Sequence, residues 1–231
     1  MKIRIKFSKT GAVKFIGHLD VMRYFQKLMR RADIPIAYSG GLSPHQVMSF
    51  ALPLGIGLES DAEYMDIEIT APMLSKEAIE AMNAASAKGM EVLSFRELPE
   101  SAGNAMASVA AADYLISFRE GFEPPFSLKD AFAGLMEQAE IIIVKKTKRS
   151  EQEVDLKPFI YRHEAGEDTL MLRLSCGSVT NIRPELVMEA LYGQQGAEFD
   201  EFGLLIKRLE LYTMQDQNFI SLNEIGTDIM A

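Results

Sequence analysis

Two histidines and a tyrosine occupy positions from which they could act together in acid–base chemistry. His18 and Tyr24 fall within a helical pattern, and His45 follows a turn at Ser43-Pro44. Imidazole and phenol groups serve as general acids and bases, and imidazole nitrogens also bind metals. If the loop folds back over the helix start, His18, His45 and Tyr24 become candidate catalytic residues. In the alternative interpretation, His18 caps the helix and His45 hydrogen-bonds the backbone.

The same stretch predicts a pocket and leaves the reaction open. The side chains expected to shape this pocket are His18, Asp20, Ser43 and His45. A three-ligand metal site would need a further group, for which Asp20 and Asp61 are the candidates. Because no known catalytic motif is completed, we predict no metal and no cofactor, and we favour a protein that is not an enzyme.

A basic stripe follows the first histidine along the helical pattern of residues 18–32. Its four cations lie opposite the apolar positions, and no acidic residue occurs between positions 21 and 32. Such a stripe suits the phosphates of RNA, with Tyr24 beside it as a stacking ring. The alternative is the solvated face that every amphipathic helix needs. The cations of the stripe are Arg23, Lys27, Arg30 and Arg31.

The charge is distributed unevenly along the chain. Residues 1–100 carry twelve Lys or Arg and twelve Asp or Glu, whereas residues 101–231 carry twelve and twenty-one, so the net charge of −9 belongs to the second half. An acidic total argues against indiscriminate binding to polyanions, but it leaves room for a local basic face. A second basic run, Lys145 to Arg149, fits either a clamp for a polyanion or a solvated connector.

The composition excludes several classes of protein. The single cysteine, Cys176, excludes a disulfide framework and an all-cysteine iron–sulfur cluster, and it points to a reducing compartment. Charged residues interrupt the apolar positions near residue 1, so we expect no secretory segment. Prolines and glycines break the uncharged run 34–58, so we expect no membrane-spanning helix. These features predict a soluble, cytoplasmic protein.

The hydrophobic periodicity predicts an α+β fold made of two similar units. Residues 2–98 alternate strand, helix, two strands, helix and strand, which is the βαββαβ order of a ferredoxin-like domain. Residues 2–8 have the alternation of a half-buried strand with its charged face in solvent, and residues 35–38 are strand-like. A similar succession of patterns begins again at residue 113 and includes a hairpin over residues 157–177. We therefore predict two tandem ferredoxin-like units, with residues 1–100 as the first unit, 101–112 as a linker, 113–214 as the second unit and 215–231 as a tail.

Several short motifs carry a resemblance to a known family. They are Gly17-His18-Leu19-Asp20, Arg30-Arg31-Ala32, Ser43-Pro44-His45, Ser49-Phe50-Ala51-x-Pro53-Leu54-x-x-Gly57 and Val154-Asp155-Leu156-Lys157-Pro158. With these motifs the chain resembles the bacterial radical-SAM-linked proteins, which are encoded beside, or fused to, cobalamin-binding radical-SAM enzymes. The resemblance implies a radical-SAM enzyme as partner. At the level of fold, the chain is more distantly similar to CRISPR repeat-associated RNA-processing proteins, which also pair ferredoxin-like units.

Three functional hypotheses follow from these patterns and from the resemblance. The first is a non-catalytic accessory protein that binds RNA, or presents an RNA substrate, for a radical-SAM enzyme. The second is a metal-independent ribonuclease or RNA-modifying enzyme that uses His18 and His45 as acid and base. The third is a pure protein-interaction module that docks its partner through open sheet edges or through the apolar segment 47–58.

Overall fold

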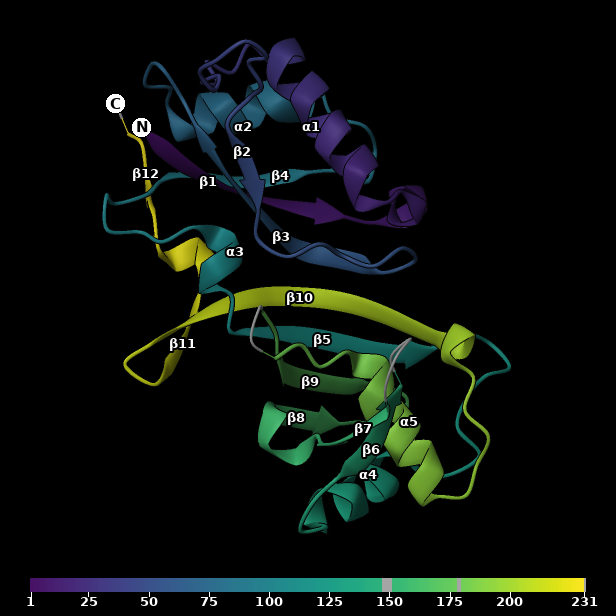
Figure 1. Ribbon diagram of the computed structural model, residues 1–231. Coiled ribbons are helices and arrows are strands. Elements are labelled where there is room, and N and C mark those ends of the chain that lie inside the picture. The colour runs from purple at the N-terminus through teal and green to yellow at the C-terminus, as the bar shows by residue number, and fades with distance from the viewer. Residues whose placement is uncertain (147–150, 178–179, 231) are drawn as a thin grey trace. The chain divides into compact units, whose positions relative to one another are not determined.

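The computed structural model describes residues 1–146, 151–177 and 180–230, and the chain folds into two compact units. Unit 1 comprises Met1–Ala110 with Arg208–Ala231, and unit 2 comprises Ala111–Lys207. Each unit combines helices with antiparallel strand pairs, so the predicted α+β class is confirmed (Figure 1).

Unit 1 shows the predicted order of elements over its first hundred residues. The strand expected over residues 35–38 is absent as such, because Ile36 and Tyr38 form only isolated bridges. One element, β10 (Leu204–Gln215), crosses from unit 2 into unit 1 at residue 208. The other elements of unit 1 are β1 (Lys2–Lys9), the 3-10 helix η1 (Gly11–Phe15), α1 (His18–Arg31), β2 (Met48–Phe50), β3 (Glu59–Glu68), α2 (Ser75–Ala84), β4 (Val92–Glu97), α3 (Ala105–Ser108), β11 (Asn218–Ser221), η4 (Leu222–Glu224) and β12 (Thr227–Asp228).

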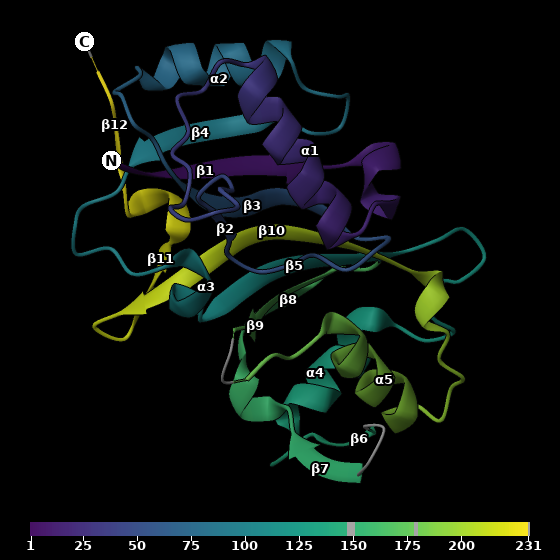
Figure 2. The ribbon, with the colours of Figure 1, turned by 45° about the horizontal axis from the view of Figure 1, so that its top comes forward.

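The core of unit 1 lies between its sheet and two helices. The strands run in the order β12-β4-β1-β3-β10, and β2 pairs with residues 65–67 of β3. Ile5 of β1 sits opposite Met65 of β3 and Phe95 of β4, and all three side chains are buried. Helices α1 and α2 cover this apolar face of the sheet (Figure 2).

Helix α1 forms where the sequence predicts it, because its apolar residues recur at helical spacing. Val21, Phe25 and Leu28 are buried against the sheet. Asp20 stands in the first turn and two arginines in the last, which complements the helix dipole. The helix ends before Asp33, whose φ of 50° turns the chain away from helical geometry.

The charged side of β1 differs from the expectation of a solvated strand face. Arg4 is only 3% exposed and holds the Asp66 carboxylate with two hydrogen bonds, of 2.8 and 2.9 Å. Lys6 pairs with Glu210 at 2.9 Å. Segments from the end of the chain cover this face, so the alternation of charged and apolar residues in β1 marks two packed faces.

Residues 101–110 of the predicted linker and the segment predicted as a tail belong to unit 1. The small residues of 101–112 form α3 and the start of β5, and Ala105 is fully buried, because residues without bulky side chains allow close packing. The tail 215–231 contains β11, which pairs with β10, and β12, which pairs with β4. The strand β11 follows β10 directly as a hairpin, whereas the partner of β12 lies far away along the chain.

Unit 2 contains one hairpin that the six-element pattern lacks. In its sheet β9 lies between β5 and β8, which confirms the hairpin expected over residues 157–177, while β6 and β7 pair separately. The tandem ferredoxin-like pair therefore stays a prediction. The elements of unit 2 are β5 (Ala111–Phe118), α4 (Leu128–Glu137), β6 (Ile142–Lys146), β7 (Glu151–Asp155), η2 (Lys157–Phe159), β8 (Ile160–Ala165), β9 (Leu170–Ser175), α5 (Pro184–Gln194) and η3 (Glu201–Gly203).

Two further expectations concern the uncharged run 34–58 and the second basic run, Lys145 to Arg149. Across the described ranges of the chain, no helix has both the length and the apolar character needed to cross a bilayer. The middle of the second basic run, residues 147–150, lies outside the described residues.

Candidate nucleic-acid interface

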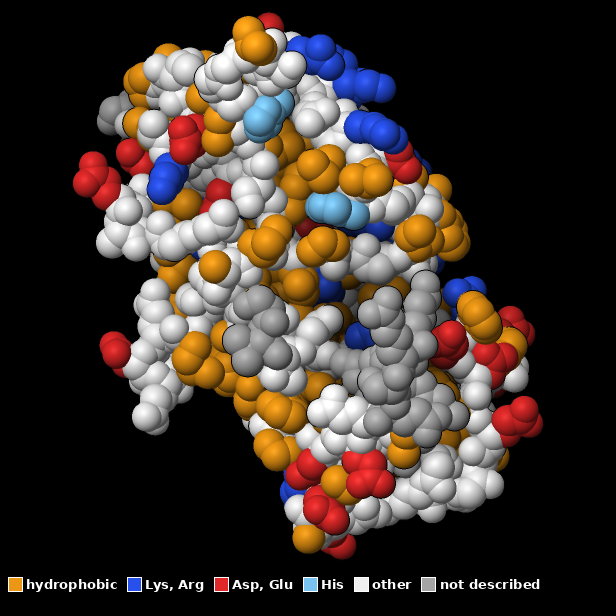
Figure 3. Space-filling view, viewed as in Figure 1, with side chains coloured by type: hydrophobic (Ala, Val, Ile, Leu, Met, Phe, Trp, Pro, Cys, Tyr) orange, Lys and Arg blue, Asp and Glu red, His pale blue; other side chains and the backbone are white. Residues whose placement is uncertain are grey.

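The outer face of α1 presents the basic stripe to solvent. Arg23, Lys27, Arg30 and Arg31 are all exposed, and their spacing of four, three and one residues keeps them within one side of the helix. Figure 3 shows Lys and Arg side chains gathered along the outer edge of α1. The stripe predicted from the sequence therefore exists as an accessible surface.

Most of the charge on this stripe is uncompensated. Arg23 pairs with Asp20 at 3.2 Å, and both side chains are more than 60% exposed. Among the described residues, Lys27, Arg30 and Arg31 have no ion-pair partner. Because an exposed pair at this spacing contributes less than about 1 kcal/mol, even Arg23 can exchange its partner for a phosphate.

The loop of residues 38–46 packs beside α1 and holds His45. The Oγ atom of Ser39 lies 2.8 Å from Nδ1 of His45 and accepts a hydrogen bond from the His45 backbone N–H at 3.1 Å. Gln46 is buried and donates from its side-chain amide to the Gln26 carbonyl of α1 at 3.2 Å. His45 itself is exposed, as is Ser43, so the loop is a closed turn anchored to the helix by Gln46.

His18 lies at the start of α1 and packs on the core. Its ring meets the Phe50 ring edge-on, with 5.3 Å between the centroids. Burial lowers the pKa of His18 below the ordinary value of 6.5. The Gly17 backbone precedes it as the helix N-cap, without any side-chain cap, so the expected capping role of His18 is not observed.

The pKa of His18 can be measured directly by NMR titration. We expect the midpoint of its ring proton shift to lie below pH 6.5 in the native protein and to return to about 6.5 in urea. Since the neutral ring is favoured in the fold, the associated stability is present above pH 6.5 and is lost as the pH falls through the folded pKa. His18→Gln assigns the resonance, and a native midpoint at or above 6.5 contradicts the expectation.

The three candidate catalytic residues have separate partners. His18 contacts Phe50, His45 contacts Ser39, and the Tyr24 hydroxyl accepts a hydrogen bond from the Ala87 backbone N–H at 2.9 Å. Within the part of the chain that is described, no hydrogen bond or ring contact joins any two of the three. The described residues also contain no group of three His, Cys, Asp or Glu side chains arranged to hold a metal.

A buried ionic cluster of Lys9, Glu63 and Arg208 supports the region before α1. Arg208 donates to Glu63 at 2.9 Å and to the Leu52 carbonyl at 3.2 Å. Lys9 donates from Nζ to the carbonyls of Lys14 and Ile16, at 3.2 and 3.0 Å. Burial raises the pKa of Glu63, against the opposing effect of Arg208, and burial lowers the pKa of Lys9. Sequence reasoning missed this cluster.

Two glycines of the family-like motifs, Gly57 and Gly17, lie where the loop before β3 meets the region that begins α1. Gly57 has a φ of 90° and donates its N–H to the Lys14 carbonyl at 2.9 Å. A side chain at Gly57 would be strained in this left-handed conformation. A Cβ at Gly17 would lie 3.8 Å from the Ile56 side chain. Gly57 therefore joins the loop before β3 to the segment that leads into α1, while Gly17 has room for a side chain.

Comparison with known proteins places the chain in a family. No curated protein matches the sequence. In the structure described as a crystal structure of a Cbf5-Nop10-Gar1 complex, one chain has 11% sequence identity to this protein and a TM-score of 0.48. That match covers 96% of this chain and 52% of the other, so the protein spans about half the length of that chain. Residues 2–184 match the family described as an uncharacterized protein conserved in bacteria (DUF2344), and the chain belongs to that family.

Proposed function

We propose that unit 1 binds RNA through the exposed face of α1 and presents it, as a non-catalytic accessory protein, to a radical-SAM enzyme. The observation that supports RNA binding is the stripe of four exposed cations, three of which have no ion-pair partner among the described residues. The radical-SAM partner is inferred from the resemblance carried by the motifs around α1.

The stripe matches a nucleic-acid backbone in length and charge. From Arg23 to Arg31 the helix rises about 12 Å, which spans several phosphates of a strand. The acidic total of the chain, −9, disfavours polyanions elsewhere on the molecule, so binding is expected to concentrate at α1. A metal-independent ribonuclease or RNA-modifying activity of His18 and His45 is not proposed, since the two rings have separate partners.

The proposal predicts a steep loss of RNA affinity with salt. Binding of purified protein to fluorescent single-stranded RNA, followed across a salt series, should give a log–log slope of magnitude about 3, because four phosphate contacts each contribute about 0.7. The variant Arg23→Gln, Lys27→Gln, Arg30→Gln should lower affinity at least about tenfold and reduce the slope by about 2.

A charge-matched variant separates this site from general electrostatics. Lys76, Lys88 and Lys129 are exposed at positions outside α1, and replacing all three with Gln changes the net charge equally. This control should retain nearly all RNA affinity and the original slope. Equal losses in both triple variants, or no saturable binding at low salt, would overturn the proposal.

A further inference from the structure

A pocket lies in unit 1 on the side of the sheet opposite α1. It has a volume of about 420 Å³, which falls within the range of roughly 300–1,000 Å³ typical of small-molecule sites. Its walls come from β1, the segment 99–103, α3, the β10–β11 hairpin and η4. The proposed RNA surface contributes no residue to it, so an inference about this pocket does not rest on the proposed function.

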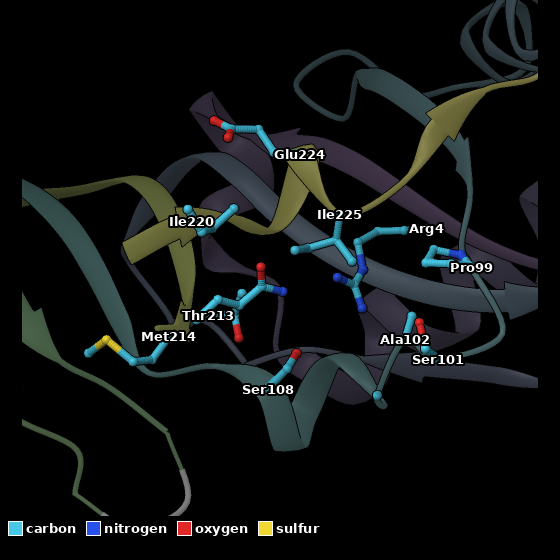
Figure 4. A pocket seen from close by; sticks show the side chains of 12 residues that line it. Arg4, Pro99, Ser101, Ala102, Ser108, Thr213, Met214, Ile220, Glu224 and Ile225 are labelled. Carbon is cyan, nitrogen blue, oxygen red and sulfur yellow. The ribbon is translucent and has the colours of Figure 1, made fainter. Parts of the chain in front are cut away.

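Arg4 forms the polar floor of the pocket and is held rigidly in place. Its Nε and Nη2 atoms donate to the two carboxylate oxygens of Asp66. Asp66 in turn accepts the Ala105 backbone N–H at 3.0 Å, which fixes the carboxylate. Nη1 of Arg4 has no hydrogen-bond partner within the described residues, and Figure 4 shows the guanidinium turned toward the middle of the pocket.

The pairing with Asp66 determines which ligand suits Arg4. Because the carboxylate already balances the guanidinium charge, Arg4 offers directional hydrogen bonds with little net positive charge. An anion placed beside this pair would also lie near Asp66, which disfavours it. The side of the guanidinium that carries Nη1 is matched better by a neutral ligand with two acceptors in one plane than by an anion.

The rest of the lining provides acceptors and apolar contact. Gln215 and Thr213, which carry an amide and a hydroxyl, line the pocket. In Figure 4 the Thr213 and Ser108 side chains face the pocket from the side opposite Arg4. Ile225 supplies an apolar surface next to the Arg4 guanidinium. An arginine on one side, polar side chains on the opposite side and the apolar surface of Ile225 suit a planar ring that has acceptors on one edge and donors on another.

We propose that this pocket binds a guanine base. Guanine presents O6 and N7 to the arginine fork, the commonest specific pairing of an arginine with a base. Its ring nitrogen and amino donors would then face the side chains of Gln215 and Thr213. The source of the base is either a free guanine nucleotide or an unpaired guanine in RNA, which share this chemistry.

Isothermal titration of the full chain with GMP and AMP tests the proposal. GMP should bind at least about tenfold more tightly than AMP, because adenine replaces the O6 acceptor with an amino donor. Arg4→Lys should lower GMP affinity about tenfold, and Gln215→Ala and Thr213→Val about threefold each. Gln195→Ala, on an exposed residue of unit 2, is the matched control and should leave GMP affinity unchanged.

Further measurements distinguish a free guanine nucleotide from a guanine in RNA, and this pocket from the RNA surface of α1. If Arg4→Lys lowers the melting temperature strongly, the GMP affinities of Gln215→Ala and Thr213→Val test whether the pocket binds the base. Arg4-dependent binding of a guanine-containing single-stranded RNA without GMP binding assigns the base to RNA and upholds the proposal. The triple α1 variant should bind GMP normally, whatever its RNA affinity. Equal GMP and AMP affinities, absence of binding to both GMP and the RNA, or insensitivity to all pocket variants would overturn the proposal.

Discussion

Replacing Glu63 with alanine should reduce the free energy of unfolding by about 3–5 kcal/mol, because it leaves the buried Arg208 without this carboxylate. Glu63 is 6% exposed and Arg208 is 3% exposed, and their side chains meet at 2.9 Å. Without the carboxylate, Arg208 keeps the Leu52 carbonyl as a partner but loses its opposite charge. Urea unfolding followed by circular dichroism measures the loss as a shift of the midpoint.

Two controls define the cause of this loss. The double variant Glu63→Leu, Arg208→Met should recover most of the stability, since apolar replacement of both partners removes the uncompensated charge. Arg23→Ala breaks an exposed pair and should cost less than about 1 kcal/mol. A cost below 1 kcal/mol for Glu63→Ala would show that water reaches the Arg208 guanidinium in the native protein.

The same cluster explains how the start of α1 is held. Lys9 donates to two carbonyls of the segment that leads into the helix, at Lys14 and Ile16. Arg208 holds the carbonyl of Leu52 in the loop that follows β2. Buried charges thus hold backbone carbonyls in two segments, the one that leads into α1 and the loop that follows β2. Removing Glu63 should therefore loosen both loops before the rest of unit 1 unfolds.

Helix α1 was predictable because its determinants are local. The apolar spacing of Val21, Phe25 and Leu28 and the cations on the other side are visible within 14 residues. The buried ionic cluster was not, because Glu63 and Arg208 are separated by 145 residues and no local pattern marks them as partners. Pairing across such distances is a property of the fold.

The candidate site shows the same division between local and distant information. Exposure of Arg23, Lys27 and Arg30 follows from their position on the helix, as predicted. The convergence of His18 with His45 depended on the path of the 38–46 loop, which Ser39 and Gln46 determine through contacts that residue types alone do not reveal. The pocket at Arg4 was equally hidden, because part of its wall comes from the segment expected to be a tail.

Replacing Phe25 with alanine should reduce the free energy of unfolding by about 3–5 kcal/mol, the usual cost of removing a buried phenylalanine ring. Phe25 is 1% exposed and packs its ring against Phe7 at 4.5 Å and Phe50 at 5.9 Å, which are centroid distances. These contacts attach α1 to the sheet. Urea unfolding measures the cost, and Leu19→Ala on the exposed side of the same helix should change stability by less than about 0.5 kcal/mol.

The Phe25 series also separates the surface of α1 from its attachment. Phe25→Leu keeps an apolar side chain in the core and should cost less than the alanine variant, because the remaining cavity is smaller. At temperatures where each variant is folded, both should bind RNA with the wild-type salt slope, since the four cations remain on the helix. If Phe25→Leu instead abolishes RNA binding while the protein stays folded, RNA recognition depends on the orientation of α1 against the sheet, and charge alone does not explain it.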